Sequence, residues 1–145
     1  MRYSMFVLFL TSFSLVAQNP LKQLEESPRH HEWVTISVDD QELHTFLVFP
    51  EVANKAPVVI LIRENRGLND WVHSMADQIA TMSYIVLALD LLSGKAPDGG
   101  GTSAFKNSYA ARTALYALDP DQITKGLQAI LAYGKKVMQQ TVKLL

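Results

Sequence analysis

The fold of this chain is constrained most strongly by two short, uninterrupted apolar runs, PVVILI at residues 57–62 and YIVLAL at residues 84–89. Runs of this length without polar alternation are typical of parallel strands that are covered on both faces. Between them, apolar side chains recur at helical spacing, which predicts a helix from about Asp70 to Met82. The predicted stripe consists of Trp71, Met75, Ile79 and Met82. Residues 57–89 are therefore expected to form a right-handed βαβ unit of an α/β protein.

Elements are also expected on both sides of this unit. Two β-rich segments, Trp33 to Val38 and Leu43 to Phe49, flank a polar turn and predict a β-hairpin. Residues 97–103 contain three successive glycines and predict a mobile surface loop. A helix is expected from about Ala104 to Leu118, and another from Pro120, capped by Asp119 with Gln122 as its capping-box partner. The apolar stripe of that last helix consists of Ile123, Leu127, Ile130, Leu131 and Val137.

The N-terminus has the pattern of a secretory signal peptide over residues 1–17. Arg2 precedes an apolar run from Met5 to Val16, and cleavage is expected after Ala17. This run of about 12 residues is shorter than the roughly 20 that a membrane-spanning helix needs. We therefore expect export to a periplasm or to the outside of the cell, with no membrane association after the signal is removed. Residues 18–31 are polar and predict a linker, and residues 32–145 form the domain.

Charge and histidine content narrow the range of partners. The 13 basic and 14 acidic residues are scattered along the chain, which argues against nucleic-acid binding. The run His30-His31-Glu32 contains common zinc ligands, but neighbours in a strand point to opposite faces, so no metal site is expected. No cofactor is expected either. His44 and His73 are expected to be exposed residues of a strand and a helix.

The loop after the first apolar run is the most informative stretch for function. It reads RENRGLN at residues 63–69, and ligands of open α/β sheets collect where strands end at their carboxyl side. Spacing alone favours an ion pair of Glu64 with Arg63 or Arg66 in a solvated loop.

The order of motifs adds a family resemblance. The hairpin sequence DDQELHTFLVFP, the segment ENRGLN, a helix and then YIVLALDLLS occur at suitable separations. Over residues 33–134 this order resembles the dienelactone hydrolase family, which implies an α/β-hydrolase fold and cleavage of a small-molecule ester or lactone. The resemblance implies that Glu64 helps to activate the nucleophile and that the backbone amide of Asn65 helps to form the oxyanion hole. Arg112 does not align cleanly with the family's substrate-binding arginine and receives no role.

The chain also departs from the family pattern. It contains no cysteine, no glycine-flanked serine elbow and no histidine after His73. The serines at positions 74, 83, 93, 103 and 108 are better explained as helix, loop and cap residues. We therefore expect a partial α/β-hydrolase fold, with a β-hairpin, a βαβ unit and two further helices, that is truncated before the nucleophile strand and inactive alone. The strand at 57–62 would keep an unpaired edge through which the chain could self-associate.

Three further interpretations stay open at this point. Codons that fit residues 139–145 can encode, in another reading frame, a lead into the family's nucleophile strand, which suggests a frameshift near residue 138. A non-catalytic α/β module that binds a small molecule or a partner is a second possibility. A flavodoxin-like domain ranks last, because no phosphate-binding loop follows the first parallel strand.

Overall fold

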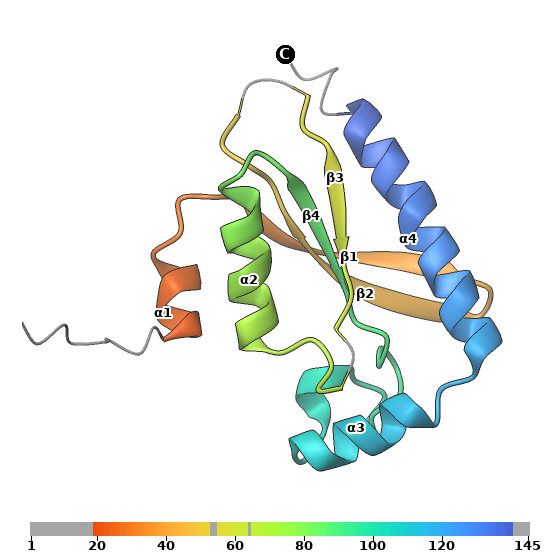
Figure 1. Cartoon of the computed structure of the whole chain (residues 1–145). Helices are drawn as coiled ribbons and strands as arrows, with labels where there is room; N and C mark the ends of the chain where they lie inside the picture. The colour runs from red at the N-terminus through yellow and green to blue at the C-terminus, as the bar shows by residue number, and fades with distance from the viewer. Residues whose placement is uncertain (1–18, 53–54, 64, 141–145) are drawn as a thin grey trace, which may run out of the picture.

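From the first strand onward, the strands and α-helices follow one another in the predicted order (Figure 1). The computed structural model describes residues 19–52, 55–63 and 65–140, without the side chains of residues 139 and 140. The strands are β1 (His31–Val38), β2 (Gln41–Val48), β3 (Val58–Leu61) and β4 (Ile85–Leu89). The helices are α1 (Pro20–Glu25), α2 (Asp70–Ala80), a 3-10 helix (Thr102–Ala104), α3 (Ser108–Tyr116) and α4 (Pro120–Gln140). In the described ranges, no helix combines the length and the apolar character needed to cross a membrane.

The four strands form one mixed sheet in the order β1-β2-β4-β3. β1 and β2 pair antiparallel as the predicted hairpin, and β2 pairs antiparallel with β4. β3 and β4 are parallel and are joined through α2, which confirms the βαβ unit. β4 has a neighbour on each side, whereas β3 has one neighbour among the described strands and lies at the edge of the sheet.

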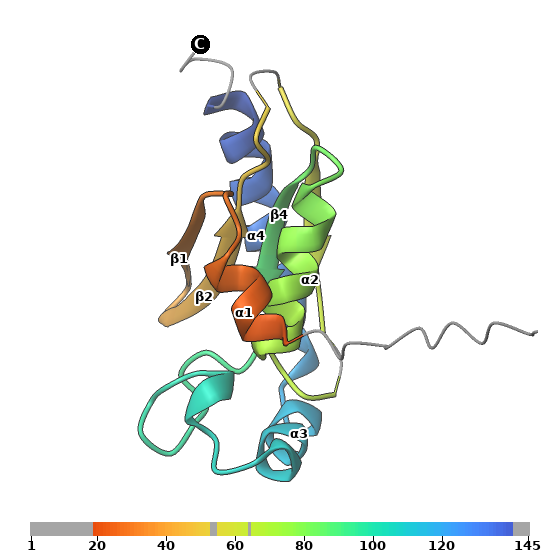
Figure 2. The same cartoon turned by 90° about the vertical axis from the view of Figure 1, so that its left-hand side faces the viewer.

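The core consists of two apolar layers, one on each face of the sheet. α2 covers one face with α1 outside it, and α4 covers the other, as Figures 1 and 2 show from two directions. Side chains of β4 alternate between the layers, because neighbouring residues of a strand point to opposite faces. Ile85, Leu87 and Leu89 pack in the α4 layer, and Val86 and Ala88 pack in the α2 layer. All five residues of β4 are buried, as expected for a strand covered on both faces.

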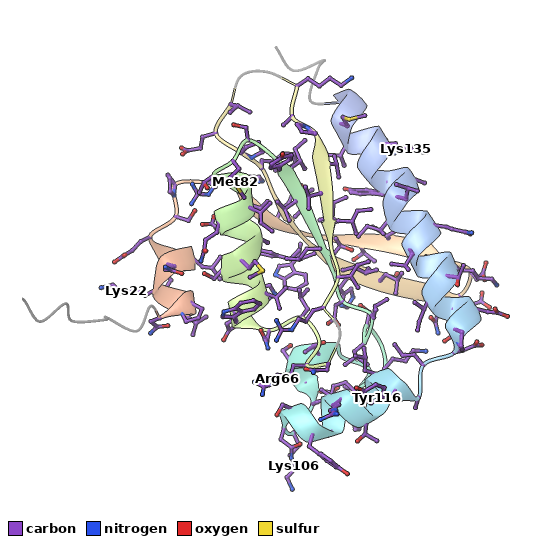
Figure 3. The ribbon with its side chains drawn as sticks, in the orientation of Figure 1. Lys22, Arg66, Met82, Lys106, Tyr116 and Lys135 are labelled. Atoms are coloured by element: carbon purple, nitrogen blue, oxygen red, sulfur yellow. The ribbon has the colours of Figure 1, made fainter. Side chains whose placement is uncertain are left out.

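The predicted apolar stripe of α2 is wrong at Trp71 and Met82, whereas Ile79 packs against the core as predicted. Trp71 and Met82 are 46% and 61% exposed, and Figure 3 shows Met82 at the far end of α2 from Arg66. The face that packs on the sheet consists of Val72, Ala76 and Ala80. Both stripes have helical spacing, but the alanines let the helix axis approach the sheet more closely than the larger side chains would. Trp71 lies on the exposed flank of the helix instead, and Met82 lies beyond its last residue, Ala80.

The segment that was expected to be a linker contains a helix. Asn19 caps α1 by accepting a hydrogen bond from the Leu21 amide at 3.1 Å, and Pro20 occupies the first helical turn. The helix packs against α2, where the Ser74 hydroxyl donates to Gln23 Oε1 at 2.7 Å. The predicted signal peptide, residues 1–17, lies outside the described residues.

Asp77 of α2 ties the segment after α1 to the rest of the domain. Its carboxylate is 4% exposed and accepts two hydrogen bonds from Arg29, at 2.8 and 2.6 Å. Ser27 Oγ and His31 Nε2 lie 2.6 and 2.8 Å from the same carboxylate. Burial alone would raise the pKa of this carboxyl, because it disfavours the charged form. The hydrogen-bond donors, Arg29 foremost, outweigh burial and lower the pKa of Asp77 from 3.8 to about 2.

The long helix α4 begins where the sequence predicts. Pro120 is its first residue, and Asp119 accepts a hydrogen bond from the Asp121 amide at 2.9 Å. Gln122 does not complete a capping box in the structure; its Oε1 accepts from Lys95 Nζ at 3.2 Å. The predicted stripe is confirmed except at its fourth residue, Leu131, which is 49% exposed.

Candidate active site

The loops that leave β3 and β4 meet at one end of the sheet. Because these strands are parallel, their carboxyl ends lie at the same edge, where open α/β sheets bind their ligands. The loop after β3 covers residues 62–69, and the loop after β4 covers residues 90–101. The 3-10 helix and α3 lie beyond this edge, at the lower end of the molecule in Figure 1.

Asp90, directly after β4, organises this end of the sheet. Its carboxylate is 4% exposed and accepts three hydrogen bonds, from the Leu92 amide at 3.0 Å and from the amide and hydroxyl of Thr102 at 2.8 and 2.7 Å. The Thr102 hydroxyl in turn accepts from the Leu68 amide at 3.0 Å. One buried carboxylate and one hydroxyl therefore join the loop after β4 to the loop after β3.

Two glycines permit this close approach. Gly67 has a φ of +64°, and a Cβ there would overlap with the Thr102 hydroxyl. A Cβ on Gly101 would overlap with the Asp90 carboxylate. The glycine-rich segment was predicted to be a surface loop. This is correct for Pro97–Gly99, which are exposed, but wrong for Thr102, which is 8% exposed.

The predicted site residues lie in the loop after β3. Glu64 falls outside the described residues, so its predicted role stays a prediction. Asn65 is exposed, and its backbone amide donates to no acceptor among the residues that the structure describes. The Arg63 guanidinium lies over the Trp71 ring, with its Cζ 4.7 Å from the ring centroid. Arg66 is exposed at the end of the molecule that also carries Lys106 and Tyr116 (Figure 3).

A pocket of about 320 Å³ opens between the start of α2 and the start of α3. Leu68 and Thr102 of the network described above contribute to its wall. The remaining wall combines the apolar residues Phe105 and Ala111 with Asn69, Asp70, His73, Ser103, Asn107 and Ser108. Asn69 and Asn107 cap α2 and α3, because their side chains accept from the amides of Val72 and Ala110. The pocket is thus small, lined by both apolar and polar side chains, and next to the loop that carries Asn65.

His73 was expected to be exposed, and this was wrong. Its side chain is only 15% exposed, and its ring packs against Phe46 and Trp33 with centroid distances of 4.6 and 5.3 Å. Burial lowers the pKa of His73, although the charge of Asp70 opposes the change. Its Nε2 atom is buried without a hydrogen-bond partner among the described residues. Histidine at this position therefore favours the neutral ring.

The other candidate residues have structural partners. Ser93 Oγ donates to the Asp90 carbonyl at 2.6 Å and accepts from the His44 amide at 2.9 Å. The Arg112 guanidinium lies over the Tyr116 ring, with its Cζ 5.5 Å from the centroid, and it does not line the pocket. His30 Nε2 lies 3.3 Å from Glu32 Oε2, whereas His31 contacts Asp77. Within the described ranges, no group of three or more histidine and carboxylate side chains could hold a metal ion.

Sequence reasoning missed the network of Asp90, Thr102 and the two glycines. The aspartate was noted as part of a motif, but nothing in the sequence indicated its partner twelve residues later. A short polar residue after a glycine run, opposite an aspartate at a strand end, is the signal that could have suggested it.

The architecture defines a mixed α/β protein, and comparison with known proteins narrows the class. The model of the Dienelactone hydrolase family matches residues 43–145. The chain belongs to the dienelactone hydrolase family, which confirms the resemblance derived from its motifs.

Individual relatives agree with this placement. A protein of Escherichia coli (strain K12) described as a hydrolase fragment, YghX, is 42% identical over 53 residues, which cover 36% of this chain and 45% of that protein. A Bradyrhizobium protein described as a 2-oxo-3-(5-oxofuran-2-ylidene)propanoate lactonase is 24% identical over 103 residues, covering 70% of this chain and 39% of that protein. A crystal structure described as a dienelactone hydrolase from Klebsiella pneumoniae superposes with a TM-score of 0.60 at 16% identity, over 74% of this chain and 44% of that one. The chain thus spans less than half the length of the relatives that it matches.

Proposed function

We propose that this chain supplies the N-terminal half of an active site that hydrolyses an ester or lactone bond of a small molecule. Membership of the dienelactone hydrolase family supports hydrolase chemistry. The observation that carries the proposal is the loop after β3, which is tied to the end of β4 and presents the Asn65 amide without an acceptor among the described residues. A fixed backbone donor at a strand end can stabilise the negative charge that develops on a carbonyl oxygen during hydrolysis.

In this proposal the two neighbouring residues have different roles. The Asn65 amide donates to the carbonyl oxygen of the substrate, so the role depends on the backbone and not on the side chain. Glu64 acts on the nucleophile as a positioning or activating carboxylate. The pocket beside the loop holds part of the substrate, and its volume of about 320 Å³ fits a small molecule.

We also propose that the 145-residue chain alone does not turn over esters or lactones. A nucleophilic serine needs a base within hydrogen-bond reach, and cysteine is absent from the sequence. In the part of the chain that the structure describes, no serine hydroxyl is hydrogen-bonded to a histidine; Ser74 and Ser93, for example, are engaged by Gln23 and Asp90. In this proposal the nucleophile and its base are therefore not supplied by these 145 residues.

Nuclear magnetic resonance of the 15N-labelled chain tests the proposal. Titration with a small lactone should shift the amide signals of Asn65, His73 and Thr102, while hydrolysis of p-nitrophenyl acetate should proceed at the rate of buffer. Asn65→Ala keeps the amide and should retain the shifts at His73 and Thr102, whereas Asn65→Pro removes the amide and should abolish them. Shifts that persist in Asn65→Pro would remove the role of the amide, and turnover above buffer would refute the proposed inactivity.

Export of the chain remains a separate proposal, supported by the signal-like pattern of residues 1–17. Mass spectrometry of the protein recovered from the periplasm of a bacterial host should give a mature chain that begins at Gln18. A chain that stays in the cytoplasm with its first residues intact would contradict it.

A further inference from the structure

We infer that Asp90 and Thr102 are positioning residues for the loop that carries Asn65, an inference that rests on the function proposed above. The two residues do not contact Asn65 itself. They act through Leu68, three residues further along the same loop.

The hydrogen bonds of Thr102 can run in only one direction. A backbone amide always donates, so the Leu68 amide donates to Thr102 Oγ1 at 3.0 Å. The single proton of that hydroxyl is therefore available for Asp90 Oδ1, at 2.7 Å. Asp90 also accepts from the Thr102 amide at 2.8 Å, which fixes the threonine by two contacts. The Thr102 hydroxyl thus connects the Asp90 carboxylate to the loop after β3 through two hydrogen bonds, and we call this connection the relay.

The residues of the relay are buried. Asp90 and Thr102 are 4% and 8% exposed, and Leu68 is 3% exposed. In the described part of the chain, no cation pairs with Asp90, so its burial depends on these neutral donors and on the Leu92 amide. A buried donor that loses its acceptor destabilises the fold by the desolvation energy of that group. Loss of the hydrogen bond to Thr102 would therefore leave the buried Leu68 amide without an acceptor, at a cost in free energy.

The glycines make the arrangement specific to this pair of loops. Gly67 lies in the left-handed region and directly precedes Leu68, so it sets the direction in which the chain enters the anchor. Its missing side chain leaves the space that the Thr102 hydroxyl occupies, and Gly101 does the same for the Asp90 carboxylate. Because a side chain at Gly67 or at Gly101 would overlap with Thr102 or Asp90, the two loops can approach this closely only with glycine at these positions.

Asn65 lies between two fixed points. β3 ends at Leu61 inside the sheet, and the loop is anchored again at Leu68. Asn65 lies three residues before the Leu68 anchor, so release of that anchor should loosen the segment that carries Asn65. Loss of the Thr102 hydroxyl should leave the sheet intact and release this loop.

Amide hydrogen exchange on the full chain tests the inference without any substrate. In the wild type, the Leu68 amide should exchange far more slowly than that of Lys106, which is exposed before α3. Thr102→Val, which keeps the shape and removes the hydroxyl, should accelerate exchange at Leu68 about ten- to a hundredfold relative to Leu87 in β4. Thr102→Ser, which keeps the hydroxyl, should restore slow exchange.

The outcomes separate a positioning role from a general structural one. Equal acceleration at Leu68 and Leu87 would show loss of global stability only and would overturn the inference. So would a serine variant that behaves like the valine variant. If the valine variant does not fold, the wild-type measurement decides, because a Leu68 amide that exchanges as fast as Lys106 is not anchored. The lactone titration is independent, since its failure would refute the proposed function and leave the exchange result standing.

Discussion

Removal of the Asp77 charge should destabilise the domain in a way that depends on pH. The carboxylate has a pKa of about 2 in the folded chain, against 3.8 for an ordinary aspartate. A lowered pKa means that the folded state favours the charged form, and a difference of this size corresponds to about 2 kcal/mol of stabilisation. This stabilisation is complete above the ordinary pKa and is lost as the pH falls from about 5 through the folded pKa, with about half of it gone by pH 3.

The variant Asp77→Asn isolates this contribution. At pH 7 it should lower the free energy of unfolding by about 3 kcal/mol, because it also leaves the largely buried Arg29 guanidinium without its anion. The difference from the wild type should shrink by about 1 kcal/mol by pH 3, where the wild-type carboxyl is partly protonated in the unfolded chain. Glu25→Gln is the matched control, since Glu25 is exposed on α1 and should change stability by less than about 0.5 kcal/mol.

Urea unfolding at pH 7, 5 and 3, followed by circular dichroism, measures these differences. Other carboxyl groups also titrate in this range, but they do so in both proteins, so the difference between wild type and variant reports Asp77. The reasoning is refuted if that difference is the same at pH 7 and pH 3. It is also refuted if Asp77→Asn is no less stable than Glu25→Gln.

Three further changes test other parts of the structure. Gly67→Ala should lower the free energy of unfolding by more than about 2 kcal/mol, because it combines an unfavourable φ with overlap on Thr102; Gly94→Ala, at a φ of +70° with open space, should cost only about 1 kcal/mol in the same urea experiment. Because burial lowers the pKa of His73, the unfolded chain binds a proton there more readily than the folded chain, and the wild type should lose stability as the pH falls from 7 to 5. His73→Phe should abolish this loss, and a variant with unchanged pH dependence would contradict the reasoning. If the edge of β3 mediates self-association, wild-type protein should sediment as larger species with rising concentration, and Ile62→Lys, a change at a residue 49% exposed after that strand, should remain monomeric.

The sequence predicted those elements whose signals are local. The apolar run at residues 84–89 predicted the strand that is buried on both faces, and the Asp119-Pro120 pair marked the start of α4. The buried face of α2 could not be chosen in this way. Trp71 and Met75 have the same spacing as Val72 and Ala76, so the decision rests on which surface the sheet can approach. The choice of the buried face of α2 thus depends on tertiary packing, which local spacing does not encode.

The site was predictable in part for the same reason. The loop after β3 was recognisable because it follows an apolar run, and Asn65 lies in it as predicted. The Thr102 hydroxyl that anchors this loop comes from a glycine-rich segment with no periodicity, so only the folded chain shows that it is buried. His73 was misjudged because a helical histidine is usually exposed, whereas the aromatic rings of β1 and β2 cover this one.

Asp77 and Asp90 show that two equally buried carboxylates can serve different ends of one domain. Each is 4% exposed, but Asp77 is paired with a guanidinium, whereas Asp90 is held by neutral donors. Asp77 lies eight residues beyond the cap of α2, which is about 12 Å along the helix, and the anchor at Thr102 lies past that cap. Effects at sites so far apart should add within about 0.5 kcal/mol, so Asp77→Asn combined with Thr102→Val should cost the sum of the two single changes. Strong coupling in urea unfolding would instead mean that α2 transmits strain between the N-terminal segment and the site loop.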